Sequence, residues 1–99
     1  MYLYLVRDKD HKNFKVGYTS KEPKKRLRNY VSHNPDIVIE GIFEIPNKSF
    51  ETYVRMELLK KGYRPVRVKG QKEWFEGTTS NHLIQEIVDK FKERYESNN

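Results

Sequence analysis

The sequence predicts a small α+β domain in which a three-stranded antiparallel sheet is flanked by helices, in the order β-β-α-β-α with one further C-terminal helix. The chain has 99 residues, about the size of a single domain. Three segments are rich in aromatic and β-branched residues, and two later segments repeat apolar residues at helical spacing. We therefore expect one domain over residues 1–96 and a loose tail over residues 97–99.

The first two predicted strands form an antiparallel hairpin. Residues 1–6 (MYLYLV) are aromatic and aliphatic, and residues 7–13 (RDKDHKN) form a polar turn. Residues 14–18 are a short second strand with Gly17 near its end. Two apolar runs around a polar turn are typical of a hairpin.

A helix should follow the hairpin and end near His33. Thr19 or Ser20 can serve as its N-cap, and Pro23 suits its first turn. The sequence Asn34-Pro35-Asp36 then ends the helix. The predicted inner face consists of Leu27, Tyr30 and Val31.

The rest of the chain supplies one more strand and two more helices. Residues 37–45 (IVIEGIFEI) form the third strand, and a helix runs over residues 49–61 until Gly62 caps it. Residues 63–79 are expected to be irregular, with the tripeptide EWF as their apolar anchor. The last helix spans residues 81–96, where apolar residues form a single helical stripe.

The composition excludes several classes of protein. There is no cysteine, which rules out a disulfide framework, a zinc–thiolate site and cysteine catalysis. No apolar run reaches the ~20 residues of a membrane-spanning helix, and the start of the chain lacks the features of a signal peptide. We therefore expect an intracellular protein, in the cytoplasm or nucleus, with no membrane partner.

Basic residues exceed acidic ones by 20 to 14, for a net charge of +6, which favours a polyanionic partner. They form one group on the first predicted helix and another on and after the second, with tyrosines interleaved. Cations beside aromatic rings suit nucleic acid, although a merely solvated basic face is the alternative. The candidate nucleic-acid contacts are Lys24, Lys25, Arg28, Arg55, Arg64, Arg67, Lys69 and Lys72.

Several short motifs give the chain a resemblance to the GIY-YIG nuclease superfamily, in particular its short stand-alone branch from phages, large viruses and fungi. Tyr2-Leu3-Tyr4 resembles the first motif, with Tyr2 where glycine is usual. Lys15-Val16-Gly17-Tyr18-Thr19 resembles that branch's KIGYT, in which lysine replaces the second tyrosine. The remaining matches are Pro23-x-x-Arg26-Leu27, Glu51-x-x-Val54-Arg55-x-Glu57-Leu58 and Glu73-Trp74-Phe75.

The resemblance covers about residues 1–76 and implies an endonuclease that hydrolyses phosphodiester bonds of DNA with one Mg²⁺ or Mn²⁺ ion. Tyr4 would then be the general base or orient the water, and Lys15 would stabilise a phenolate or the phosphoryl charge. Duplex DNA is the expected partner, with a homodimer or a second protein supplying specificity. The implied catalytic residues are Tyr4, Lys15, Tyr18, Arg26, Tyr30 and Glu51, of which Glu51 is the metal ligand.

Other interpretations stay open at this point. The fold and basic face could serve a non-catalytic nucleic-acid-binding module, because Tyr2 and Lys15 depart from the usual motifs. Without the motif, Tyr4 would be read as a core residue, and Trp74 is expected to be a core residue rather than a base-stacking platform. Glu57 competes with Glu51 as the metal ligand, and helical spacing places Glu57 near the centre of the buried stripe and Glu51 at its edge. We favour Glu51, because in the resembling family the glutamate precedes the Val-x-x-Glu-Leu pattern.

Overall fold

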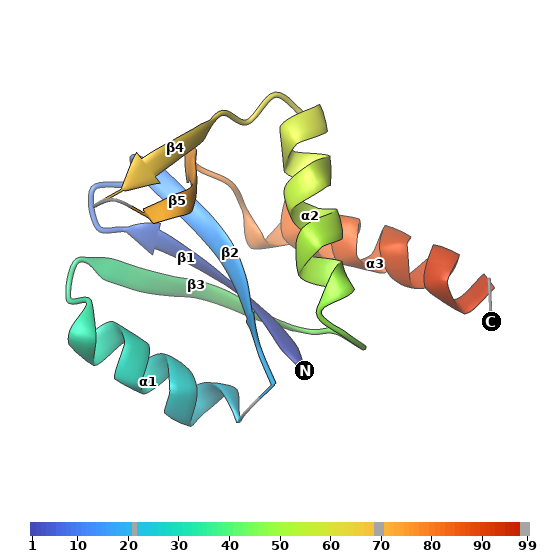
Figure 1. The fold of residues 1–99 in the computed structure, drawn as a ribbon, viewed down its shortest axis with the longest axis horizontal. Coiled ribbons are helices and arrows are strands. Elements are labelled where there is room, and N and C mark those ends of the chain that lie inside the picture. The colour runs from blue at the N-terminus through green and yellow to red at the C-terminus, as the bar shows by residue number, and fades with distance from the viewer. Residues whose placement is uncertain (21, 69–70, 98–99) are drawn as a thin grey trace.

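The computed structural model describes residues 1–20, 22–68 and 71–97, without the side chains of residues 71–73 and 97. It confirms a small α+β fold (Figure 1). In chain order the elements are β1 (Tyr2–Asp8), β2 (Asn13–Thr19), α1 (Pro23–His33), β3 (Ile37–Glu44), α2 (Ser49–Lys60), β4 (Pro65–Val68), β5 (Gln71–Glu76) and α3 (Asn81–Ser97).

The sheet has five strands in the order β3-β1-β2-β5-β4, so the predicted three-stranded sheet is wrong. The expected irregular segment contains β4 and β5, which pair antiparallel with each other. β5 also pairs with β2, although only through Asn13, Phe14 and Lys15 of that strand. β4 is four residues long and begins with Pro65, so it carries little strand signal of its own and depends on pairing with β5.

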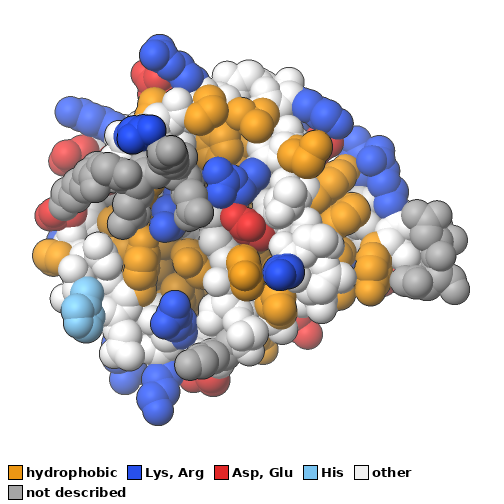
Figure 2. Space-filling view, in the orientation of Figure 1, with side chains coloured by type: hydrophobic (Ala, Val, Ile, Leu, Met, Phe, Trp, Pro, Cys, Tyr) orange, Lys and Arg blue, Asp and Glu red, His pale blue; other side chains and the backbone are white. Residues whose placement is uncertain are grey.

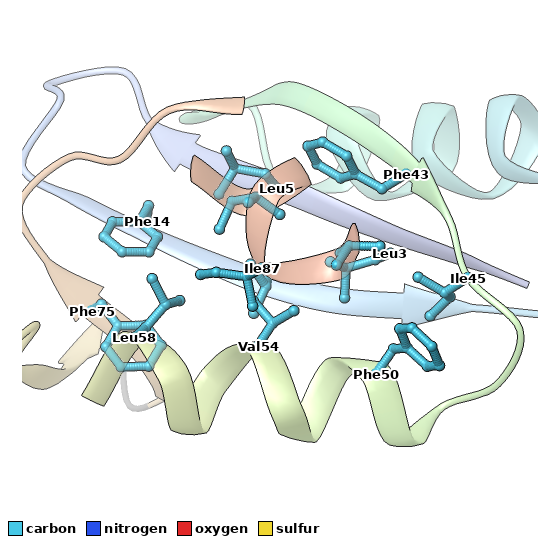
Figure 3. Close-up of a cluster of buried hydrophobic side chains, with 13 residues drawn as sticks. Leu3, Leu5, Phe14, Phe43, Ile45, Phe50, Val54, Leu58, Phe75 and Ile87 are labelled. Atoms are coloured by element: carbon cyan, nitrogen blue, oxygen red, sulfur yellow. The ribbon is translucent and has the colours of Figure 1, made fainter. Parts of the chain in front are cut away.

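The main core lies between one face of the sheet and the helices α2 and α3. Apolar side chains alternate along β1 and β2, so that every second residue points into this core. Figure 3 shows side chains of α2 and α3 meeting those of the strands. Among the fully buried members are Leu3, Leu5, Phe14, Phe50, Val54 and Leu58.

A smaller cluster lies on the opposite face of the sheet, where α1 packs (Figure 1). Its buried residues are Val6, Ile37 and Trp74, and the half-buried Tyr4 and Tyr30 pack against them. Tyr4 and Lys15 belong to this face because side chains alternate along β1 and β2. Most of the predicted catalytic residues therefore lie on the α1 side of the sheet.

The ends of the helices correct two details of the sequence interpretation. α1 begins at Pro23, as its position in a first turn predicts, but its N-cap is Glu22 rather than Thr19 or Ser20. The Glu22 carboxylate accepts hydrogen bonds from the backbone N–H groups of Lys24 and Lys25 at 3.2 and 3.3 Å. α3 extends to Ser97, and residues 98–99 of the predicted tail lie outside the described residues.

Gly62 follows α2 with a φ of +95°, the left-handed conformation that the predicted helix cap requires. None of the helices in the described part of the chain has the length and apolar character needed to cross a membrane.

Candidate functional site

The ring of Tyr4 lies directly over Gly17 of the neighbouring strand. The two residues are paired across β1 and β2, and a Cβ at Gly17 would lie 2.5 Å from the Tyr4 hydroxyl oxygen and 2.6 Å from Cζ. A side chain at position 17 would therefore displace the ring. The glycine of the second motif is needed for this close approach, because it lets the phenol of the first motif extend across β2.

Lys15 is buried on the same face of the sheet as Tyr4. Its side chain is 7% exposed, and its Nζ lies 5.4 Å from the centroid of the Tyr30 ring and 5.9 Å from that of Trp74. The rings of Tyr4 and Tyr30 are 6.2 Å apart, centroid to centroid. Aromatic faces attract a cation, and this attraction offsets part of the free-energy cost of burying the ammonium. Three predicted site residues, Tyr4, Lys15 and Tyr30, thus come together under α1.

Arg26 and Tyr30 line one hollow on the surface of α1. The hollow has a volume of about 300 Å³, and Asn29, His33 and Asn34 complete its lining. The helical residues in this set recur three or four positions apart, so they share one flank of α1. Arg26 is exposed at this hollow, so its guanidinium faces solvent there.

Tyr18 points away from this group. It follows Gly17 in β2 and pairs with Leu3, whose side chain belongs to the main core on the α2 side of the sheet. Because side chains alternate along a strand, Tyr18 and Lys15 face opposite sides. The Tyr18 side chain is 42% exposed. The structure therefore separates Tyr18 from Tyr4, Lys15 and Tyr30.

Glu51 and Glu57 occupy opposite flanks of α2. Tyr53 stacks on Phe91 of α3 with ring centroids 4.0 Å apart, so the flank that Tyr53 shares with Glu57 faces α3. The Glu51 flank lies away from α3. The side chains of Glu51 and Glu57 are 17% and 15% exposed, so the prediction that Glu57 sits near the centre of the buried stripe is wrong.

The Glu51 carboxylate has a basic neighbour one turn along the helix. Nη1 of Arg55 donates to its Oε1 at 3.4 Å, a long and weak contact. In Figure 1 the second half of β2 passes between α1 and α2. Glu51 belongs to the helix on one side of this strand, and Arg26 belongs to the helix on the other side. No group of three or more His, Asp or Glu side chains capable of holding a metal occurs among the described residues.

The predicted nucleic-acid contacts do not share one face. Lys25 lies on the Arg26 flank of α1, whereas Lys24 and Arg28 line a separate groove between α1 and β3. Arg67 is exposed in β4, and Arg64 is exposed just before it. Nε of Arg64 lies 3.8 Å from Oε2 of Glu76. Figure 2 shows basic side chains spread over the visible face, with hydrophobic ones between them. Lys69 and the side chain of Lys72 lie outside the described residues.

Sequence reasoning missed several neighbours of the site. Trp74, predicted as a core residue, is indeed buried at 3% exposure, but it is also a ring against which Lys15 packs. Asn29 and His33 were not singled out, although their spacing of three and seven residues from Arg26 is a signal that could have found them. Asp36 was read only as part of a helix-breaking turn, and it lines a cavity beside Tyr30.

Fold and site together define a small α+β domain with tyrosine, lysine and arginine side chains around the β1–β2 hairpin. The chain matches the T5orf172 domain over residues 1–93 and belongs to that family. The family is related to the GIY-YIG nucleases and is found in phage and nuclease-like proteins. The predicted relation to GIY-YIG proteins is confirmed at this level. Neither a curated protein nor a solved structure matches the chain.

Proposed function

We propose that this protein is a metal-dependent endonuclease that hydrolyses phosphodiester bonds of DNA, in the manner of the short stand-alone GIY-YIG proteins. The observation that carries the proposal is the seating of the Tyr4 ring on Gly17, beside Lys15 and Tyr30. A fold alone does not define an activity, because one fold serves many functions. Here, however, the tyrosine of the first motif and the glycine of the second have a shared geometric role, because the ring of Tyr4 fits only over a residue without a side chain.

The residues under α1 supply the groups that phosphodiester hydrolysis requires. In its phenolate form, Tyr4 orients the attacking water and accepts its proton, which leaves a neutral phenol and a hydroxide that attacks the phosphorus. The Lys15 ammonium provides a buried positive charge beside the Tyr30 ring, on the same face of the sheet as Tyr4. Arg26 binds the phosphoryl oxygens with its planar fork of N–H donors, and Tyr30 offers a second hydroxyl beside them.

Glu51 is the residue that would hold a divalent cation. Its carboxylate is partly exposed, and its contact with Arg55 at 3.4 Å is long, so it can offer an oxygen ligand to an ion. Mg²⁺ commonly keeps several water ligands and needs only one or two carboxylates, so a single glutamate is enough where the described residues contain no larger acidic cluster. When bound, such an ion supplies charge neutralisation at the phosphoryl and leaving oxygens.

The test compares two glutamates of the same helix. Glu51→Gln removes the proposed ligand, and Glu57→Gln is the matched control because both side chains are similarly exposed. Purified proteins are incubated with supercoiled plasmid in Mg²⁺, Mn²⁺ or EDTA. We expect metal-dependent nicking by the wild type and by Glu57→Gln, and none by Glu51→Gln, at unchanged thermal stability.

Three results would contradict parts of the proposal. Nicking by Glu51→Gln but not by Glu57→Gln identifies Glu57 as the ligand. Nicking by both variants removes the single-carboxylate site altogether. A wild type that binds the plasmid but never nicks it, with either metal, is a non-catalytic nucleic-acid-binding module.

A further inference from the structure

An apolar groove lies between α1 and the outer strand of the sheet. β3 is the outermost strand at one edge, and α1 lies next to it (Figure 1). The groove has a volume of about 510 Å³. Its apolar lining consists of Leu27 and Val31 of α1 and Ile39 and Ile42 of β3, and the Ile42 side chain is 43% exposed. An exposed apolar surface beside a strand edge is typical of a contact with another protein chain.

The groove and the strand beside it carry opposite charges. Lys24 and Arg28 lie one turn apart on the α1 wall of the groove, and both are exposed. Glu44 is exposed near the end of β3, two residues after Ile42. Within the described part of the chain, none of these three charged side chains forms an ion pair. The same surface therefore holds both halves of a charge-complementary contact.

The backbone of β3 can accept another strand over a short stretch. The N–H of Ile45 donates to the carbonyl oxygen that precedes β1, at 2.9 Å, so Ile45 directs its peptide groups to β1. In an antiparallel ladder every second residue does so, which turns the peptide groups of Ile42 and Glu44 outward. Earlier in the strand, Nδ2 of Asn81 donates to the carbonyl oxygen of Glu40 at 2.8 Å and covers the edge there. Ile42 and Glu44 therefore form the part of the edge that can pair.

We propose that this edge is an interface between two copies of the chain, in which β3 pairs antiparallel with β3 of a second copy around a two-fold axis at Phe43. Such a symmetric contact makes Ile42 of each copy the neighbour of Glu44 of the other. This register joins the outward peptide groups of both residues in hydrogen-bonded pairs. A register centred on Ile42 would instead set Glu44 against Glu40, and like charges directly opposite each other are destabilising.

The same register brings the opposite charges together. Ile42 lies opposite Tyr4 of β1 and therefore points to the α1 side of the sheet, as does Glu44 two residues later. Directly opposed side chains of paired strands have Cβ atoms about 4.5–5.5 Å apart. Glu44 of the second copy thus lies beside Ile42, at the groove whose wall holds Lys24 and Arg28. Symmetry repeats this contact, so Ile42 is covered in both copies.

The interface is separate from the proposed catalytic site. The hollow that Arg26 and Tyr30 line is on the other flank of α1 and stays open in both copies. A two-fold axis between antiparallel strands runs perpendicular to the sheet, so both catalytic sites face the same side of one continuous sheet. The inference therefore goes beyond the proposed nuclease function and does not rest on it.

Sedimentation velocity at increasing protein concentration tests the interface without DNA or metal. We expect the wild type to show a monomer–dimer equilibrium of micromolar affinity, because a contact made by one short strand pair belongs to the small, transient class of interfaces. Hydrogen exchange at the backbone amides of Ile42 and Glu44 should slow as the concentration rises. A wild type that stays monomeric up to millimolar concentration overturns the inference, and so does exchange at these amides that is independent of concentration.

Charge reversal tests the register. Glu44→Lys sets like charges against each other and should weaken the dimer by at least about tenfold. Lys24→Glu combined with Arg28→Glu should weaken it as well, although a lower net charge by itself reduces repulsion between copies. All three substitutions together restore opposite charges and should return the affinity close to that of the wild type.

Glu96→Lys is the matched control for net charge. It makes the same change of charge as Glu44→Lys at an exposed residue of α3, so it should leave the dimer affinity unchanged. Circular dichroism checks that the variants fold. A dimer that persists in Glu44→Lys, an equal loss in Glu96→Lys, or a folded triple variant that stays monomeric overturns the inference.

Discussion

Gly17→Ala is the sharpest test of the Tyr4–Gly17 contact. The new Cβ would lie 2.5 Å from the Tyr4 hydroxyl oxygen, where ordinary contacts begin at 3.4 Å, so the phenol must move by roughly 1 Å. A displacement of that size at a catalytic group costs about 10²-fold in rate. We therefore expect plasmid nicking to fall by about that factor while DNA binding stays nearly unchanged.

The stability change should be small, which separates this effect from unfolding. Gly17 lies within β2 and has no positive φ, so alanine is compatible with its backbone. Replacing a strand glycine gains about 0.4–1 kcal/mol when no clash arises, and overpacking costs about 1–3 kcal/mol. The crowded atoms are the end of one side chain that can swing aside, so we expect a net loss of about 1 kcal/mol.

A double-mutant cycle and a control variant complete the experiment. In a Tyr4→Ala background the clash is absent, so Gly17→Ala should become neutral or stabilising in thermal unfolding. Gly41→Ala is the matched control, because its Cβ would come within 2.4 Å of Asn81 Oδ1, away from the proposed site. Wild-type nicking by Gly17→Ala, or an equal loss in Gly41→Ala, would refute the assigned role of this contact.

Three further predictions address the same site. Tyr4→Phe keeps the ring but removes the hydroxyl, so nicking should fall by about 10²–10⁴ while binding, measured by fluorescence anisotropy, is retained. Lys15→Met replaces a buried cation by an apolar side chain of similar length, so nicking should be lost, and thermal unfolding checks that the variant still folds. Arg26→Ala should reduce the rate of nicking more than Lys24→Ala, which removes a charge from the other flank of α1. Arg26→Lys should recover only part of that loss. A time course of plasmid relaxation measures all three rates.

The elements that the sequence predicted are those whose signal is local. The β1–β2 hairpin has alternating apolar residues around a polar turn, and α2 carries its buried residues one turn apart between Ser49 and Gly62. β4 and β5 could not be predicted in the same way. β5 begins with the polar residues QKE, and its apolar part becomes a strand by pairing with β2, a contact between distant parts of the chain.

Part of the candidate site, like part of the fold, could be predicted from the sequence. Motif spacing pointed to Tyr4, Lys15 and Gly17, and the structure places all three on adjacent strands. The packing of Lys15 against Trp74 needed the structure, because Trp74 lies in the strand that was read as irregular. The basic residues of α1 lie on two flanks because of helical spacing. Applying that spacing to the charged residues, as well as to the apolar ones, could have predicted this.

The short pairing of β5 explains why the site lies where it does. β5 pairs with β2 at Asn13, Phe14 and Lys15, and in the described part of the sheet the segment from Val16 to Tyr18 is paired with β1 alone. A strand edge without a neighbour is open to another molecule. Tyr4 crosses this segment at Gly17, and α1 and α2 approach it from opposite sides, as Figure 1 shows. In the proposed nuclease, this part of β2 would be where an extended phosphodiester chain reaches Tyr4.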